Sequence, residues 1–247
     1  MHDMSSSTRQ TFWLVSGASR GIGLELVKQL LESPNNVVIA ACRIPDKANT
    51  LNALQGSAKG SLHVIRLEVT DFDSVRAVPQ AMAPILGEHG LDYLVNNAGI
   101  ARQDTPLTLD PEVFLETLRT NTVGPALLTQ ACMPFLDKGR EKKVLNISST
   151  LGSIAKADAL EHLRSGGAAT YCVSKSALNM LTYKLKQERP DLTVIMLCPG
   201  WVKTDLGGES AVLEAKESIA GIIKVITSAT LADSGKYLSY TGAEIPW

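Results

Sequence analysis

The chain has 247 residues and carries 24 lysines and arginines against 25 aspartates and glutamates, a balance that gives no indication of nucleic acid or an anionic membrane as a partner. No apolar run approaches the roughly 20 residues of a membrane span, and the first ten residues, MHDMSSSTRQ, lack the apolar stretch of a secretory signal. We therefore expect one cytoplasmic domain over 1–247, with residues 1–10 as a flexible N-terminus and a small molecule as its partner.

Seven short apolar runs alternate along the chain with segments of helical spacing. They are TFWLVSG (11–17), NVVIAACR (36–43), LHVIRLEV (62–69), LDYLVNNAG (91–99), KVLNISS (143–149), LTVIMLCPG (192–200) and KYLSYTG (236–242). Several are almost continuously apolar, as is typical of parallel strands covered on both faces. The alternation predicts an α/β fold, a Rossmann-type doubly wound parallel sheet of about seven strands with helices on both faces. Ligands of such sheets bind at the carboxyl ends of the strands.

The first strand is followed by a glycine-rich stretch, SGASRGIG, which contains Gly17, Gly21 and Gly23. Glycines there allow positive φ and let backbone amides approach a pyrophosphate at the N-terminus of the next helix. The spacing is GxxxGxG and differs from the common GxGxxG fingerprint. A turn that merely needs glycine is the alternative, but the position at the first strand-to-helix junction favours a dinucleotide.

The end of the second strand indicates which dinucleotide is bound. An acidic residue there would accept hydrogen bonds from a ribose 2′-hydroxyl, whereas an arginine would pair with a 2′-phosphate. The segment reads IAACR, with Arg43 in that region and no acid before Asp46, and Arg20 in the loop adds a second cation. These guanidiniums favour NADP(H) over NAD, the alternative being two solvated arginines.

Two further features bear on chemistry. In YCVSK, Tyr171 and Lys175 lie four residues apart and so share one face of a helix, where a lysine needs a partner.

In RTNTVGPAL, Pro125 follows Asn121 by four residues and has no N–H to donate, so the Asn121 carbonyl should be unpaired and available to water. An ordinary helix kink is the alternative interpretation of Pro125.

Taken in order, SGASRGIG, NNAG (96–99), Asn121, NISS (146–149), YCVSK and PGWVKT (199–204) resemble the short-chain dehydrogenase/reductase family over essentially the whole chain. The stretches PGWVKTDLGG and YTGAEIPW are most similar to the carbonyl reductases grouped with the sniffer and C-factor proteins. The resemblance implies a catalytic tetrad of Asn121, Ser149, Tyr171 and Lys175. Tyr171 would be the general acid, and Lys175 would lower the pKa of its phenol and hold the nicotinamide ribose.

Ser149 would polarise and orient the substrate carbonyl. Ser148 competes for this role, and we choose Ser149 because the family motif places the active serine three residues before a glycine, here Gly152. Tyr171 lies 22 residues after Ser149, further than the family spacing, and the additional residues fall in AKADALEHLRSGG (155–167). We expect this insertion to shape the substrate entrance.

The resemblance also implies cofactor contacts along the carboxyl edge of the sheet. They come from Gly17, Ser19, Arg20, Gly21, Ile22, Gly23, Arg43, Glu68, Val69, Asn96, Asn97, Ala98, Gly99, Tyr171, Lys175, Pro199, Gly200, Val202 and Thr204. Glu68 departs from the aspartate common at its position. Residues 205–218 follow as a candidate lid, with Gly207 and Gly208 as hinges.

The cysteines, Cys42, Cys132, Cys172 and Cys198, and the four histidines show no metal-ligand spacing, so we expect reduced thiols and no metal. We expect NADPH-dependent reduction of an aldehyde or ketone. A secondary-alcohol dehydrogenase working oxidatively and a nucleotide-binding signalling or sensor protein are the alternatives. The resemblance further implies a homodimer or homotetramer built through the helices that carry Asn121 and Tyr171. Nothing in the sequence identifies the substrate.

Overall fold

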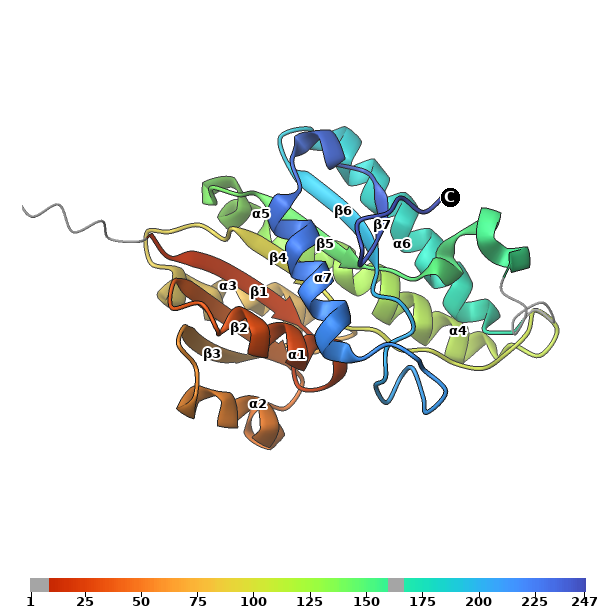
Figure 1. Cartoon of the computed structure of the whole chain (residues 1–247), viewed down its shortest axis with the longest axis horizontal. Coiled ribbons are helices and arrows are strands. Elements are labelled where there is room, and N and C mark those ends of the chain that lie inside the picture. The colour runs from red at the N-terminus through yellow and green to blue at the C-terminus, as the bar shows by residue number, and fades with distance from the viewer. Residues whose placement is uncertain (1–8, 160–166) are drawn as a thin grey trace, which may run out of the picture.

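The computed structural model of the protein describes residues 9–159 and 167–247 and contains one seven-stranded parallel sheet (Figure 1). The strands are β1 (Thr11–Ser16), β2 (Asn36–Cys42), β3 (Ser61–Arg66), β4 (Tyr93–Asn96), β5 (Lys143–Ile147), β6 (Thr193–Cys198) and β7 (Tyr237–Ser239). Their order across the sheet is β3-β2-β1-β4-β5-β6-β7. All seven predicted runs contain a strand, which confirms the predicted Rossmann-type fold.

Helices cover both faces of this sheet, because side chains along each buried strand point alternately to either side. On one face, α1 (Gly21–Leu30), α2 (Asn49–Ala53) and α7 (Ala215–Ser228) pack with Val15. On the other, α3 (Phe72–Leu86) and α5 (Gly124–Lys138) pack with Leu14. Figure 1 shows α1 and α7 on the near face, with α3 and α5 behind the sheet. The remaining long helices are α4 (Pro111–Leu118) and α6 (Ala169–Glu188).

The strand order reverses direction beside β1, which pairs with β2 on one side and β4 on the other. Chain segments that leave these two strands diverge there, and ligands of doubly wound sheets bind in the resulting crevice. The carboxyl ends of β1, β4, β5 and β6 therefore bring the glycine loop, the NNAG stretch, the two serines and Pro199 to one edge.

A buried lysine supports the opposite, amino-terminal edge. The side chain of Lys143, the first residue of β5, is only 6% exposed and lies 3.3 Å from a carboxylate oxygen of Glu141. Its ammonium also donates to the carbonyls of Ile226 and Thr227, at 3.2 and 2.9 Å. These carbonyls end α7, where the helix dipole favours a cation, so Lys143 fixes α7 against the sheet.

Two predicted segments are only partly described. Of the N-terminus, 1–10, the described residues are the exposed Arg9 and Gln10, and of the insertion, 155–167, residues 160–166 lie outside the description. A 3₁₀ segment, η5 (Ile154–Ala159), enters the insertion. Within the described ranges, no helix combines the length and apolar character needed to cross a bilayer.

Candidate active site

The glycine loop is held in place by the end of β4. Gly17 has φ +65°, and a Cβ there would lie 2.8 Å from the Cα of Ala98, so only glycine fits. The Ser16 hydroxyl accepts from the backbone N–H groups of Asn97 and Ala98, at 3.0 and 3.2 Å, and the Asn97 amide donates to the carbonyls of Ser16 and Gly17. A Cβ at Gly23 would lie 2.3 Å from the Gly17 carbonyl oxygen. The start of α1 is thereby drawn close to β1.

This loop fits a pyrophosphate. The N-cap position of α1, Arg20, makes no side-chain cap to the described residues, so the first amides of the helix remain available to an anion. A Cβ at Gly21 would come 3.5 Å from the methyl group of Thr204. Ser19 and Ile22 complete the turn. The predicted Gly17, Ser19, Gly21, Ile22, Gly23 and Thr204 therefore lie around one loop.

The two arginines assigned to the 2′-phosphate are exposed and only loosely paired. Arg43 Nε lies 3.8 Å from a carboxylate oxygen of Glu68, and Arg20 Nη1 lies 3.6 Å from Asp205. Exposed ion pairs of this kind contribute little, so each guanidinium can turn to a phosphate. Glu68 itself accepts from the amide and hydroxyl of Thr70, at 3.2 and 2.9 Å. The carboxylate of Glu68 thus stabilises the turn that leads to Thr70.

Tyr171 and Lys175 lie on the buried face of α6, one turn apart. The ammonium nitrogen of Lys175 is 5.6 Å from the centre of the Tyr171 ring and donates to the Ile147 carbonyl at 2.8 Å. The Tyr171 hydroxyl hydrogen-bonds the Ser149 side chain. The structure therefore brings three predicted tetrad members together at the carboxyl end of β5.

The electrostatics of this pair differ from the expectation. Burial is the strongest influence on the Tyr171 phenol and raises its pKa, although the hydrogen bond with Ser149 acts in the opposite direction. Burial also lowers the pKa of Lys175 to about 8. The expected lowering of the phenol pKa by Lys175 is therefore not met in the protein alone. A tyrosine with a raised pKa keeps its proton at neutral pH, as an acid must.

The two adjacent serines point to different partners. The hydroxyl of Ser148 donates to the side-chain oxygen of Asn179 at 2.6 Å, whereas Ser149 bonds Tyr171. A Cβ at Gly152 would lie 3.0 Å from the backbone carbon of Lys175, so a glycine is needed for this loop to pack on α6. Geometry favours Ser149 over Ser148 as the residue that faces a substrate.

Asn121 lies in a π-helical turn, η3 (Arg119–Val123), in which the N–H of Gly124 donates to the carbonyl of Arg119. Its side chain is fully buried, accepts from the N–H of Ile100 at 2.9 Å, and donates to the carbonyl of Ile100 and the hydroxyl of Ser174 at 2.8 and 3.0 Å. Isolated π turns are frequent at functional sites. Pro125 signalled an irregularity here, but not its π form.

Gly99 lies between the side chains of Asn121 and Lys175. A Cβ at Gly99 would lie 3.3 Å from the side-chain oxygen of Asn121 and 3.7 Å from the ammonium nitrogen of Lys175. All four tetrad candidates thus surround the carboxyl ends of β4 and β5. Val69 is buried nearby, and its carbonyl oxygen would lie 2.8 Å from a Cβ at Gly124.

The segment after β6 closes over the glycine loop. The Pro199 carbonyl accepts from the buried Ser218 hydroxyl at 2.6 Å, and Gly200 has φ +82°. Val202 is buried and bridges to Leu213. These contacts bring the predicted Pro199, Gly200, Val202 and Thr204 to the same edge as the other candidates.

The structure revises the candidate lid. Residues 215–218 belong to α7, which shortens the segment to 205–214. Gly208 has φ +73°, a conformation suited to a hinge, whereas a Cβ at Gly207 would lie 2.0 Å from the Val202 carbonyl oxygen. Gly207 therefore serves close packing, which spacing along the chain could not reveal.

Two residues near the site were missed as functional candidates. The thiol sulfur of Cys198 accepts from the N–H of Thr150 at 3.1 Å, and the hydroxyl of Tyr237 donates to the Ser149 carbonyl. The sequence predicts only a reduced thiol at Cys198. Its place at the end of β6, next to β5 in the sheet, is a signal that depends on knowing the strand order.

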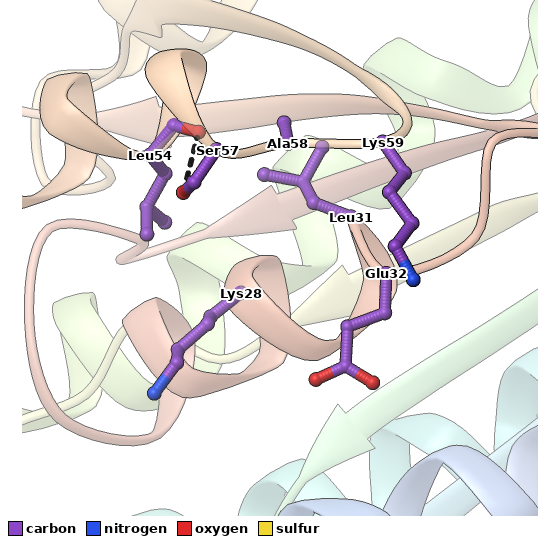
Figure 2. A pocket seen from close by; sticks show the side chains of 7 residues that line it. All are labelled: Lys28, Leu31, Glu32, Leu54, Ser57, Ala58 and Lys59. Carbon is purple, nitrogen blue, oxygen red and sulfur yellow. Dashed lines mark hydrogen bonds between the residues drawn. The ribbon is translucent and has the colours of Figure 1, made fainter.

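Two surface hollows lie apart from these residues. One of about 190 Å³ lies between α1 and the turn after α2, with Lys28 and Glu32 on one side and Leu54, Ser57 and Lys59 on the other (Figure 2). The second, of about 370 Å³, is lined by residues of α7 and 240–242. None of the tetrad candidates lines either hollow. Within the described residues, no cluster of histidine, cysteine and acidic side chains could hold a metal.

A glycine loop at the first strand-to-helix junction, beside a buried Ser149–Tyr171–Lys175 cluster at the switch point of a parallel sheet, defines a dinucleotide-binding oxidoreductase. The sequence pattern of the family described as short chain dehydrogenase matches residues 11–214. The chain belongs to this family.

Similar proteins include two solved carbonyl reductases. The NADPH-bound carbonyl reductase from chicken fatty liver is 37% identical, with 97% of this chain and 100% of that chain covered and a TM-score of 0.90. Carbonyl reductase Sniffer of D. melanogaster is 32% identical with the same coverage and a TM-score of 0.87. The C-signal protein of Myxococcus xanthus is 36% identical over 160 residues, which cover 64% of this chain and 93% of its own.

Proposed function

We propose that this protein reduces an aldehyde or ketone with NADPH, and that Tyr171 supplies the proton. The observation that carries the proposal is the buried Tyr171 hydroxyl, which holds its proton at neutral pH, hydrogen-bonds Ser149 and lies one helical turn from Lys175. A dinucleotide held by the glycine loop would supply a hydride to the carbonyl carbon. The similarity to an NADPH-bound carbonyl reductase supports the same reaction class.

Each residue of the tetrad has a distinct task. Ser149 donates a hydrogen bond to the substrate oxygen and orients it, and Tyr171 transfers its proton to that oxygen, which yields an alcohol. Lys175 would hold the nicotinamide ribose and pass a proton back to Tyr171. A water at the Asn121 carbonyl would relay a proton from solvent to Lys175.

Arg43 and Arg20 support NADPH over NADH. Both are exposed at the adenosine side of the glycine loop, and their weak pairing with Glu68 and Asp205 leaves them free to bind a 2′-phosphate. Glu68 and Val69 would contact the adenine, and Asn97, Ala98 and Gly99 would line the path to the nicotinamide. Pro199, Gly200, Val202 and Thr204 close over the other end.

We further propose a homodimer or homotetramer in the cytoplasm. The outer face of α6 exposes Val173 and Met180, an apolar pair suited to a second copy. All four cysteines are free thiols, in keeping with a reducing compartment. A monomeric mass by light scattering contradicts the oligomer.

A panel of aldehydes, aromatic ketones and diketones tests the function, with consumption of NADPH or NADH followed by absorbance and the reverse reaction followed with alcohols. We expect turnover with a lower KM for NADPH than for NADH. An equal or lower KM for NADH overturns the cofactor assignment. Tight NADPH binding with inactivity in both directions across the panel favours a sensor instead. We consider that role because of the similarity to the C-signal protein.

A further inference from the structure

Tyr237 is buried behind the catalytic serine. It is the first residue of β7, its side chain is 1% exposed, and its hydroxyl donates to the backbone carbonyl of Ser149. The same carbonyl accepts from the N–H of Gly152 at 2.8 Å, so both of its lone pairs are occupied. The peptide that carries the Ser149 hydroxyl is therefore held by a residue from another strand.

The Tyr237 hydroxyl also belongs to a wider network. Its oxygen also lies close to the side chains of Ser148 and Asn179, which bond each other at 2.6 Å. Asn179 lies one turn after Lys175 on α6, and its amide donates to the Gly152 carbonyl at 3.3 Å. The network therefore connects the serine loop to the helix face that carries the other catalytic side chains.

Another contact anchors Thr150, the next residue of the loop. Thr150 donates from its N–H to the Cys198 sulfur at 3.1 Å, and the two side chains lie 3.0 Å apart. Residues 148, 149, 150 and 152 are thus each tied to β6, β7 or α6. The hydroxyl of Ser149, in contrast, is bonded to Tyr171 and, within the described residues, accepts from the N–H of Leu151. The loop is rigid where it is supported and presents one hydroxyl to the site.

We propose that Tyr237 is a positioning residue for the reaction: its hydroxyl fixes the Ser149 peptide so that the serine hydroxyl faces both Tyr171 and the substrate oxygen. This inference rests on the proposed function, in which Ser149 and Tyr171 act on a carbonyl. Displacement of a catalytic group by about 1 Å costs on the order of 100-fold in rate. Loss of one neutral hydrogen bond costs only about 1 kcal/mol of stability, so the effect on rate should exceed the effect on folding.

The test uses Tyr237→Phe, which retains the ring and its packing 6.0 Å from the Trp247 ring. Tyr183→Phe is the matched control, because Tyr183 also packs against Trp247, at 5.7 Å, but lies on the outer face of α6. We expect Tyr237→Phe to lower kcat by about 10- to 30-fold while the KM for NADPH changes by less than about twofold. Tyr183→Phe should leave both unchanged.

A double-mutant cycle with Ser149→Ala decides whether Tyr237 acts through the serine. In the Ser149→Ala background, Tyr237→Phe should lower kcat by less than about twofold, because there is no hydroxyl left to position. The same loss in both backgrounds, or no loss in the wild type, overturns the inference while the proposed function stands. Full activity of Ser149→Ala itself overturns the serine role and this inference together.

Hydrogen exchange gives a measurement that does not need turnover. The N–H groups of Gly152 and Ser153 bond the carbonyls of Ser149 and Thr150, at 2.8 and 3.0 Å. Tyr237→Phe should accelerate exchange in a peptide that spans them, and Tyr183→Phe should not. Unchanged exchange in Tyr237→Phe shows that the hydroxyl does not hold the loop and overturns the proposal.

Discussion

Replacement of Lys175 by methionine should make the protein more stable while it abolishes turnover. Lys175 is 4% exposed, and burial moves the pKa of its ammonium from 10.5 to about 8. At about 1.36 kcal/mol per pKa unit, a shift of this size costs the folded state roughly 3 kcal/mol at pH 7. The hydrogen bond to the Ile147 carbonyl, at 2.8 Å, offsets about 2 kcal/mol of this. Lys175→Met should therefore raise the free energy of unfolding by about 1 kcal/mol at pH 7.

The pH dependence has a defined sign. The folded pKa lies below the unfolded one, so the unfolded wild type binds more protons between pH 8 and 10.5, and its stability rises with pH through that window. Lys175→Met has no such group. Its advantage over the wild type should fall by about 2.5 kcal/mol between pH 7 and pH 10 and change sign.

Urea unfolding of both proteins without nucleotide, at pH values from 7 to 10, measures this difference directly. Lys184→Met is the control, because Lys184 is exposed on the same helix and donates to the side-chain oxygen of Gln187 at 3.0 Å. Its difference from the wild type should be small and independent of pH. If the Lys175→Met and wild-type curves run parallel with pH, the burial argument is wrong.

Three further substitutions probe other parts of the structure. Arg43→Ala should raise the KM for NADPH about tenfold and leave that for NADH unchanged; equal changes contradict the 2′-phosphate assignment. Gly17 has φ +65°, and the Cβ that Gly17→Ala adds would lie 2.8 Å from the Cα of Ala98. The variant should therefore weaken NADPH binding in calorimetry and lower the free energy of unfolding by about 2 kcal/mol. Normal binding and stability would refute the close approach. Lys143→Ala removes the cation at the end of α7 and should lower stability by about 3 kcal/mol and Tm by about 6–12 °C, and an unchanged Tm excludes this role.

Much of the fold was predictable because it depends on local patterns. Apolar runs flanked by turn residues predicted all seven strands, and the GxxxGxG spacing placed a tight loop where Gly17 meets Ala98. Helical periodicity put Tyr171 and Lys175 on one face. Each of these signals acts within a few residues of the chain.

The remainder depends on contacts between distant segments. The π turn at Arg119–Val123 is held by Asn121 against Ile100 and Ser174, none of which Pro125 could indicate. The raised pKa of Tyr171 arises from burial, which spacing does not report. Tyr237 reaches Ser149 across 88 positions, and only the strand order brings them together.

The central claim is that the Tyr171 hydroxyl is the proton donor, and Tyr171→Phe tests it most directly. The variant should lower kcat by about 10³-fold, within the range of general acid catalysis, while the Kd for NADPH by calorimetry stays within about twofold. A kcat within about tenfold of the wild type, or a loss of NADPH affinity equal to the loss of rate, contradicts the account.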